Sequence, residues 1–179
     1  MDNKSRLKEI LLEKAIKFGD FTLASGQKSK YYINCKMATL DSEGLNLIAE
    51  LMLDKLEGIG CDAVGGLTLG ADPIVGAMVA LAHNRGRQLT GFIVRKESKD
   101  HGTKSLVEGP LAEGSRVAII EDVATTGGSA MKAIESAQAQ KCRIVKILVI
   151  VDRRQGAEEK FAALGLPFDP IFRKEDLGL

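Results

Sequence analysis

A run of four apolar residues, followed by two acidic residues and a turn of small residues, constrains this chain more than any other stretch. Residues 117–120 predict a strand that is buried on both faces, and Glu121 and Asp122 stand at its carboxyl end. A turn of small and hydroxyl residues follows, and we expect a helix to begin at Ser129. In an open α/β sheet, ligands bind just outside the carboxyl ends of the strands, so this turn is the first candidate for a binding site.

The turn has the features that a phosphate group needs. The start of a helix offers unpaired N–H groups and the positive end of the helix dipole. Thr125, Thr126 and Ser129 add hydroxyl donors. Gly127 and Gly128 let the backbone close around an anion.

The acidic pair suits a different part of a ligand. Glu121 and Asp122 repel phosphate, but they accept hydrogen bonds from sugar hydroxyls or bind a divalent cation. The whole segment therefore favours a ribose phosphate. The alternative is an ordinary strand-to-helix turn, in which glycine and threonine are common, but the coincidence of strand, acids and hydroxyls argues against it. Neither a Walker motif nor a G-x-G-x-x-G motif is present.

Strands and helices alternate along most of the chain, which predicts an open, doubly wound parallel α/β sheet. Strands are expected at residues 62–66, 89–94, 117–120, 144–151 and 167–172, and helices at 74–83, from 129 and at 157–164. Near the N-terminus we expect a helix that begins at Ser5 and is stopped by Gly19, then a hairpin over residues 21–34. Asp41 and Ser42 are expected to cap the next helix.

These elements predict one domain spanning residues 1–179. Within it, residues 1–40 form an N-terminal helix and a hairpin hood, and residues 62–172 form the core sheet. Residues 96–110 carry no apolar period, and a loop of this length in a compact domain is usually functional or disordered. A solvated surface loop is one interpretation. Its basic sequence and its place after a strand of the sheet favour a mobile lid over a highly charged substrate.

Composition excludes several classes of protein. The formal net charge is +1, which leaves no basic excess for a broad nucleic-acid surface. Cys35, Cys61 and Cys142 lack metal-ligand spacing and indicate reduced thiols of a cytoplasmic protein. No apolar run is long enough to span a membrane, and no signal peptide is expected.

The central segment resembles the phosphoribosyl diphosphate signature of the type I phosphoribosyltransferases. The run Arg-Lys-Glu-x-Lys-Asp-His-Gly at residues 95–102 resembles the catalytic loop of the orotate phosphoribosyltransferases. Phe-Thr-Leu-x-Ser-Gly at residues 21–26 resembles their hood, and Asp152-Arg153 completes the pattern. The resemblance implies the type I fold and transfer of ribose 5-phosphate from phosphoribosyl diphosphate to N1 of orotate. The products would be orotidine 5′-monophosphate and diphosphate, in the biosynthesis of UMP.

The resemblance also implies roles for particular residues. Phosphoribosyl diphosphate would be bound by Arg95, Lys96, Lys99, His101, Glu121, Asp122, Val123, Ala124, Thr125, Thr126, Gly127, Gly128 and Ser129. Lys99, His101 and Asp122 would be catalytic. Thr125 and Arg153 would contact orotate, with the guanidinium fork on the orotate carboxylate.

Mg²⁺ and a second subunit are implied in the same way. The ion would be held mainly by the substrate, with Glu121 and Asp122 reaching it through water, and no residue would bind it directly. The loop lysine and histidine of one subunit would reach the site of its neighbour, which implies a homodimer. Neither nucleic acid nor a membrane is expected as a partner.

The chain departs from many of these relatives at three places. Ala24 and Gly70 stand where lysines are common, which removes cations from the diphosphate pocket. Lys28 is either a turn residue or a partial replacement. The paired aromatic residues of the hood correspond to Tyr32 and Ile33, which leaves stacking on orotate open.

Two other functions remain as alternatives. The first is a phosphoribosyltransferase for a purine or for uracil, because the central signature is shared. The second is a non-catalytic regulator that senses phosphoribosyl diphosphate.

Overall fold

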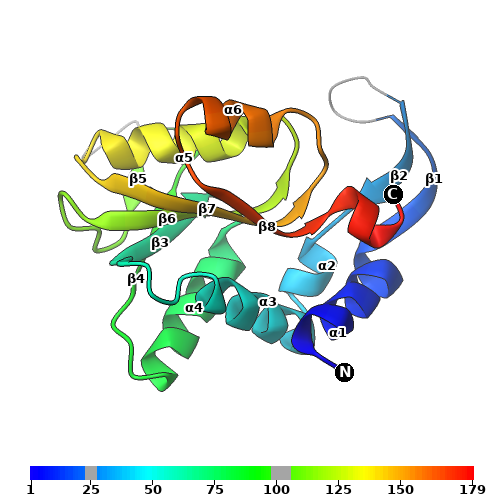
Figure 1. Cartoon of the computed structure of the whole chain (residues 1–179), viewed down its shortest axis with the longest axis horizontal. Helices are drawn as coiled ribbons and strands as arrows, with labels where there is room; N and C mark the ends of the chain where they lie inside the picture. Colours follow the sequence, from blue (N-terminus) through cyan, green and yellow to red (C-terminus); the bar gives the residue numbers. More distant parts are fainter. Residues whose placement is uncertain (23–27, 98–105) are drawn as a thin grey trace.

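Two sheets organise the chain: a six-stranded sheet and a two-stranded hairpin at one end of it (Figure 1). The computed structural model describes residues 1–22, 28–97 and 106–179. The strand order of the large sheet is β5-β4-β3-β6-β7-β8, and only the β4–β5 pair is antiparallel. Its strands are β3 (Ala63–Leu67), β4 (Thr90–Val94), β5 (Val107–Glu108), β6 (Arg116–Ala124), β7 (Arg143–Asp152) and β8 (Phe168–Arg173). The predicted open, doubly wound sheet is confirmed.

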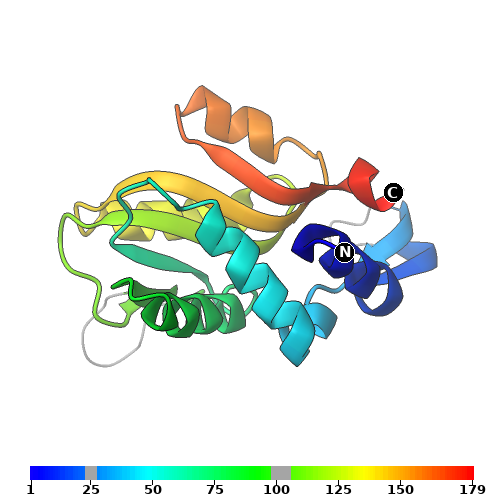
Figure 2. The same ribbon diagram turned by 60° about the horizontal axis from the view of Figure 1, so that its bottom comes forward.

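Helices cover both faces of this sheet (Figures 1 and 2). Helices α3 (Ser42–Asp54) and α4 (Asp72–Asn84) pack on one face, and α5 (Gly128–Gln138) and α6 (Ala157–Ala163) on the other. The central strand β6 divides its side chains between the two cores. Ala118 and Ile120 belong to the core with α3 and α4, and Val117 and Ile119 to the core with α5 and α6. Because a strand alternates its side chains and both faces are covered, every position of the run is apolar.

The direction of winding changes between β3 and β6. From β3 the chain passes through α4 to β4 on one side, then returns to β6 on the other side of β3 and continues through α5 to β7. Adjacent strands whose connections leave in opposite directions form a topological switch point, and a crevice opens at their carboxyl ends. The fold therefore places a binding crevice between the ends of β3 and β6.

The N-terminal segment forms the hairpin hood, made of β1 (Ile16–Thr22) and β2 (Lys28–Ile33). It is preceded by α1 (Asn3–Ile10) and a π-helical turn η1 (Leu11–Ala15), and followed by α2 (Lys36–Thr39). The hairpin is confirmed in kind, but it begins at Ile16, so the helical segment ends before the predicted stop at Gly19. Asp2, and not Ser5, is the N-cap, because the Asp2 carboxylate accepts the Ser5 N–H at 2.9 Å.

Other element boundaries also differ from expectation. Strand β6 continues to Ala124, because its partner β7 runs to Asp152 and the two residues pair. Glu121 and Asp122 therefore lie inside the strand. Strand β5, helix α2 and the C-terminal 3₁₀ turn η2 (Lys174–Leu177) were not predicted. The Asp41 cap of α3 is confirmed by its contact with the Gly44 N–H at 2.9 Å.

Both chain ends lie at the end of the molecule that carries the hood (Figures 1 and 2). The Lys4 ammonium sits 5.4 Å from the centroid of the Phe172 ring, which joins α1 to the end of β8. Within the described ranges, no helix has the length and apolar character that crossing a membrane requires.

Candidate active site

A cleft of about 280 Å³ opens at the switch point between the ends of β3 and β6. Residues from α2, from the ends of β3, β4 and β6 and from α5 line it: Lys36, Leu67, Thr68, Leu69, Gly70, Ala71, Lys96, Glu121, Asp122 and Ser129. Four of these, Lys96, Glu121, Asp122 and Ser129, were predicted as site residues. The structure brings Lys96 to the other three, which come from a separate stretch of the chain.

The turn after β3 packs directly against Asp122. A β-carbon on Gly70 would lie 2.6 Å from Oδ1 of Asp122, closer than any side chain tolerates. The Thr68–Leu69 peptide bond in this turn is cis. The Thr68 hydroxyl donates to the Asp72 carboxylate at 2.7 Å, which joins the turn to the first residue of α4. Glycine at position 70 therefore allows the turn and the acidic pair to form one wall of the cleft.

The two acids differ in their surroundings. Glu121 is largely buried, and its Oε2 has no hydrogen-bond partner among the described residues. Burial raises the pKa of Glu121 to about 7, the charge of Asp122 adds to the rise, and the Ser129 side chain opposes it. Asp122 accepts the Val123 N–H through Oδ1 at 2.9 Å, and its Oδ2 lies 3.9 Å from Nζ of Lys36. The pKa of Glu121 is thus raised toward neutrality, and Asp122 lies at the limit of ion-pair distance from Lys36.

The turn that leads into α5 is shorter than the predicted phosphate cradle. Strand β6 includes Val123 and Ala124, and the Ala124 side chain is fully buried. These two residues therefore have only backbone groups to offer, and the turn itself spans residues 125–127. Gly127 is the N-cap of α5, with a φ of 73° in the left-handed region. A β-carbon there would lie 2.6 Å from the Phe161 ring, so glycine is required on two counts.

Arg153 follows β7 and lies against the hood. Its side chain is buried, and its Cζ lies 4.9 Å from the centroid of the Tyr31 ring. Its backbone N–H donates to the Ala124 carbonyl at 2.9 Å. Its Nη2 donates to the Ser29 hydroxyl at 3.4 Å, at the long end of a hydrogen bond. Nε is buried with no partner in the described part of the chain. A buried guanidinium with an unfilled donor is a ready site for a carboxylate.

The hood presents one face to the site. Ser29, Tyr31 and Ile33 alternate on the inner side of β2, so Tyr31 is the aromatic residue beside Arg153. Tyr32 points outward and packs on Phe21, with ring centroids 5.7 Å apart. Tyr32 and Ile33, for which stacking on orotate was left open, are therefore divided between the outer face and the core.

The remaining predicted residues are less closely gathered. Arg95 donates its N–H to the Leu106 carbonyl at 2.8 Å and pairs with Glu108 at 3.4 Å, at the base of the loop. Lys99 and His101 lie outside the described residues. Lys36 lines the cleft but was not predicted, because a lysine after a hairpin carries no local signal of function.

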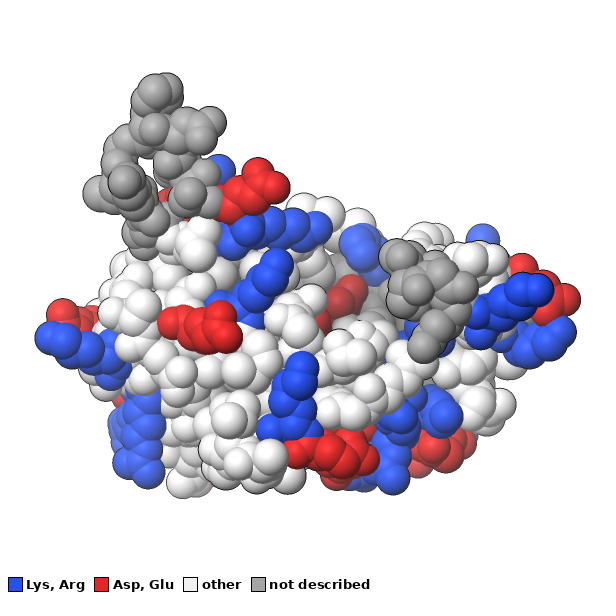
Figure 3. All heavy atoms as spheres, turned by 90° about the horizontal axis from the view of Figure 1, so that it is seen from above, with Lys and Arg blue, Asp and Glu red and all other residues white. Residues whose placement is uncertain are grey.

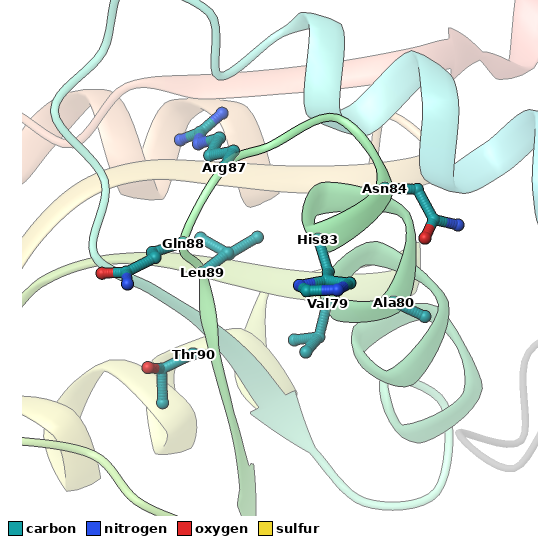
Figure 4. A pocket seen from close by; sticks show the side chains of 8 residues that line it. All are labelled: Val79, Ala80, His83, Asn84, Arg87, Gln88, Leu89 and Thr90. Carbon is teal, nitrogen blue, oxygen red and sulfur yellow. The ribbon is translucent and has the colours of Figure 1, made fainter.

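A second hollow of about 670 Å³ lies away from this site (Figure 4). Its lining comes from the end of α4 and the segment that leads into β4: Val79, Ala80, His83, Asn84, Arg87, Gln88, Leu89 and Thr90. It lies at the amino end of β4, the edge of the sheet opposite to the cleft, and none of these residues is acidic. On the face drawn in Figure 3, Lys and Arg side chains are scattered among acidic and uncharged residues and form no continuous basic patch.

Comparison with known proteins agrees with this geometry. Residues 41–164 match the family model of the phosphoribosyl transferase domain. The chain is 47% identical over 177 residues to the orotate phosphoribosyltransferase of Thermosynechococcus vestitus, covering 98% of this chain and 93% of the relative.

Solved structures give the same result. The orotate phosphoribosyltransferase of Mycobacterium tuberculosis H37Rv in complex with Fe(III) dicitrate superposes with a TM-score of 0.88 and 37% identity, covering 99% of this chain and 100% of the other. The crystal structure of that enzyme in complex with 5-phospho-alpha-D-ribosyl 1-diphosphate gives a TM-score of 0.84 and 34% identity, with the same coverage. The chain belongs to the phosphoribosyl transferase domain family and, within it, to the orotate phosphoribosyltransferases.

Proposed function

We propose that the cleft between β3 and β6 binds phosphoribosyl diphosphate and that Arg153 and Tyr31 hold orotate beside it. The observation that carries this proposal is the buried Nε of Arg153, which has no partner in the described residues. An unfilled charged donor in a buried site is costly, and a carboxylate ligand fills it with a bidentate contact. Orotate has such a carboxylate, whereas adenine and uracil do not.

The ribose phosphate is assigned to the end of β6 and the turn that follows. Glu121 and Asp122 accept hydrogen bonds from the ribose hydroxyls. The N–H groups at the start of α5, together with Thr125, Thr126 and Ser129, bind the 5′-phosphate. Backbone groups of Val123, Ala124, Gly127 and Gly128 complete this cradle.

The reaction places positive charge on the sugar and negative charge on the leaving group. As the bond from the anomeric carbon to diphosphate breaks, the ribose ring becomes oxocarbenium-like, as in other glycosyl transfers. The bond to N1 of orotate forms on the opposite side. Ionised Asp122 near the ring stabilises its positive charge, and Arg95 and Lys96 stabilise the negative charge of the diphosphate. Orotate is already anionic, so the site does not need a strong general base.

Mg²⁺ fits the chemistry of this cleft. Glu121 has a buried oxygen without a partner, and Asp122 has an oxygen on the cleft, so both accept hydrogen bonds from metal-bound water or sugar hydroxyls. Within the described ranges, no group of three or more His, Cys, Asp and Glu residues is arranged to hold a metal. Mg²⁺ bound with the donor would be held mainly by substrate oxygens, with Glu121 and Asp122 reaching it through water, and it would neutralise charge on the diphosphate.

Residues 96–110 are proposed as the catalytic loop within a single phosphoribosyltransferase domain of residues 1–179. Lys99 and His101 are assigned to the diphosphate by resemblance and reach the site of a neighbouring subunit in a homodimer. The described ends of the loop are fixed, since β5 pairs with β4 and the Leu106 carbonyl accepts the Arg95 N–H. A cytoplasmic location is proposed from the three free, buried cysteines, which suit a reducing compartment.

The loss of orotate ultraviolet absorbance in the presence of phosphoribosyl diphosphate and Mg²⁺ tests the assignment. Adenine, hypoxanthine and uracil serve as competing acceptors under the same conditions. We expect orotate to be consumed at least about a hundredfold faster than the other bases, because only orotate fills the Arg153 donor. If a purine or uracil were the preferred acceptor, the assignment of Arg153 to acceptor recognition would be wrong. If the chain bound phosphoribosyl diphosphate without any turnover, the result would favour a non-catalytic sensor.

A further inference from the structure

The turn at residues 67–71 forms the wall of the cleft nearest β3, and it has no cation of its own. Its side chains are apolar, apart from the Thr68 hydroxyl, which is already bonded to Asp72. The acidic pair lies against this turn and adds negative charge to the same wall. A donor that carries a diphosphate requires positive charge near this turn, and backbone N–H groups alone supply only partial charges.

Lys36 supplies charge at this place. It lines the same cleft as the turn and the acidic pair, and its Nζ lies 3.9 Å from Oδ2 of Asp122. That separation is at the limit of an ion pair and too long for a hydrogen bond. The Lys36 side chain is 47% exposed, so its ammonium is only weakly held by Asp122 and is free to turn toward a ligand.

The backbone that carries Lys36 is firmly placed. Cys35, Ala38 and Thr39 on either side are almost fully buried, so α2 is anchored in the core while the lysine projects from it. A cation on a fixed backbone loses less entropy on binding than one on a free loop.

The lysines of the hairpin are placed differently. Lys28 and Lys30 alternate with the inward-facing residues of β2 and are exposed on its outer side. Lys30 already pairs with Asp20. The expectation that Lys28 partly replaces lost charge is therefore not supported by its position. Of these three lysines, Lys36 of α2 is the one that lines the cleft.

We propose that Lys36 binds the diphosphate group of the donor and of the product in the cleft that it shares with the 67–71 turn. This inference rests on the proposed placement of phosphoribosyl diphosphate in the cleft. The competing explanation is that Lys36 only neutralises Asp122. In that case its loss would disturb the ribose contacts of Asp122 and leave the diphosphate contacts intact.

Two fragments of the donor separate these explanations. Inorganic diphosphate with Mg²⁺ probes one half of the site and ribose 5-phosphate probes the other, and both are measured by calorimetry on the full chain. Lys36→Met removes the charge and keeps the length, Lys36→Arg keeps the charge, and Lys30→Met removes the same charge from the outer face of the hairpin. Lys36→Gln serves as a second neutral variant, and thermal melting verifies folding.

We expect Lys36→Met and Lys36→Gln to weaken diphosphate binding by about tenfold or more, the size of a lost charged hydrogen bond. Ribose 5-phosphate binding should stay within about twofold, and Lys36→Arg and Lys30→Met should resemble the parent chain. Equal weakening of both fragments would overturn the proposal in favour of the Asp122 explanation. Unchanged diphosphate binding, or the same loss in Lys30→Met, would also overturn it. These binding measurements do not depend on which base is the acceptor, so a negative result for Lys36 would leave the orotate assignment untouched.

Discussion

The guanidinium of Arg153 lies over the ring of Tyr31, with Cζ 4.9 Å from the ring centroid. This contact joins two segments that are far apart in the chain, the end of β7 and the inner face of the hood. The ring restricts the guanidinium on one side, while Nε has no hydrogen-bond partner among the described residues. The orientation of the proposed orotate contact therefore depends on the hood.

Replacing Arg153 with lysine should remove the fork and keep the charge. We expect kcat/KM for orotate to fall by about a hundredfold, because a single ammonium makes one contact where the fork makes two in a buried site. The KM for phosphoribosyl diphosphate should change by less than about threefold, since its proposed contacts lie on β6 and α5. Steady-state kinetics with each substrate varied in turn give both numbers.

Arg154→Lys is the matched control, because Arg154 is exposed and pairs with Glu158 at 2.6 Å on the surface. Its kinetics should equal those of the parent chain. If both lysine variants lost the same activity, or if neither lost any, Arg153 would not be the orotate contact.

Glu121 links the stability of the protein to pH. Its pKa is raised from 4.5 to about 7, so the folded state holds its proton more tightly than the unfolded state does. The stability contributed by the protonated form is fully present below pH 4.5 and is lost as the pH rises toward 7. For such a shift the loss is at most about 3 kcal/mol. Glu121→Gln mimics the protonated form, so at pH 8 it should melt roughly 5 °C or more above the parent chain.

The same substitution should behave differently near pH 5, where the parent chain is already largely protonated at this position. The two melting temperatures should converge there, and thermal melts in the absence of substrate at both pH values test this. A constant difference would mean that Glu121 does not titrate in the window. Turnover should be strongly reduced in Glu121→Gln at every pH, because the amide accepts sugar hydroxyls less well than a carboxylate does.

The sheet was the part of the fold that local sequence predicts best. Residues 117–120 and 144–151 lie in β6 and β7 because continuous apolar runs suit strands buried on both faces. Ends of elements were predicted less well, because distant partners set them: β6 continues to Ala124 only because β7 runs beside it to Asp152. Strand β5 has two residues, too few to show any period, and its pairing with β4 defines it.

Some residues of the site can likewise be predicted from local sequence, and others depend on distant parts of the fold. Glu121, Asp122 and the 125–127 turn are neighbours in sequence, so one motif predicts them together. Lys36 reaches the site only through the packing of α2 against the rest of the fold, and no local pattern marks it. The raised pKa of Glu121 likewise comes from burial by the folded chain. Distances across the fold, and not residue types, decide these features.

Lys99 is expected to act mainly on the rate of the chemical step. Negative charge on the leaving diphosphate grows in the transition state, so a cation aimed there contributes more to turnover than to ground-state binding. Lys99→Ala should lower kcat by about a hundredfold or more, the scale of losing one such stabilising group, while the Kd for phosphoribosyl diphosphate changes by only a few-fold. Single-turnover rates and calorimetry separate the two effects. Near-normal turnover would exclude Lys99 from the mechanism.

Gly127 and Gly128 are adjacent in the proposed phosphate turn, yet alanine should cost much more stability at the first position than at the second. Gly127 has a φ of 73°, and a β-carbon there would meet the Phe161 ring at 2.6 Å, so Gly127→Ala combines backbone strain with a clash in the core. At Gly128 the nearest neighbour of a β-carbon is the Thr126 hydroxyl at 3.9 Å, an ordinary contact.

We expect Gly127→Ala to destabilise the fold by about 2 kcal/mol or more and to raise the KM for phosphoribosyl diphosphate, because the start of α5 must shift. Gly128→Ala keeps its backbone N–H and should change stability by less than about 1 kcal/mol, so chemical denaturation of the two variants should separate them clearly. Equal stability of the pair would mean that Phe161 yields to the added methyl group and that α5 does not depend on glycine for its start.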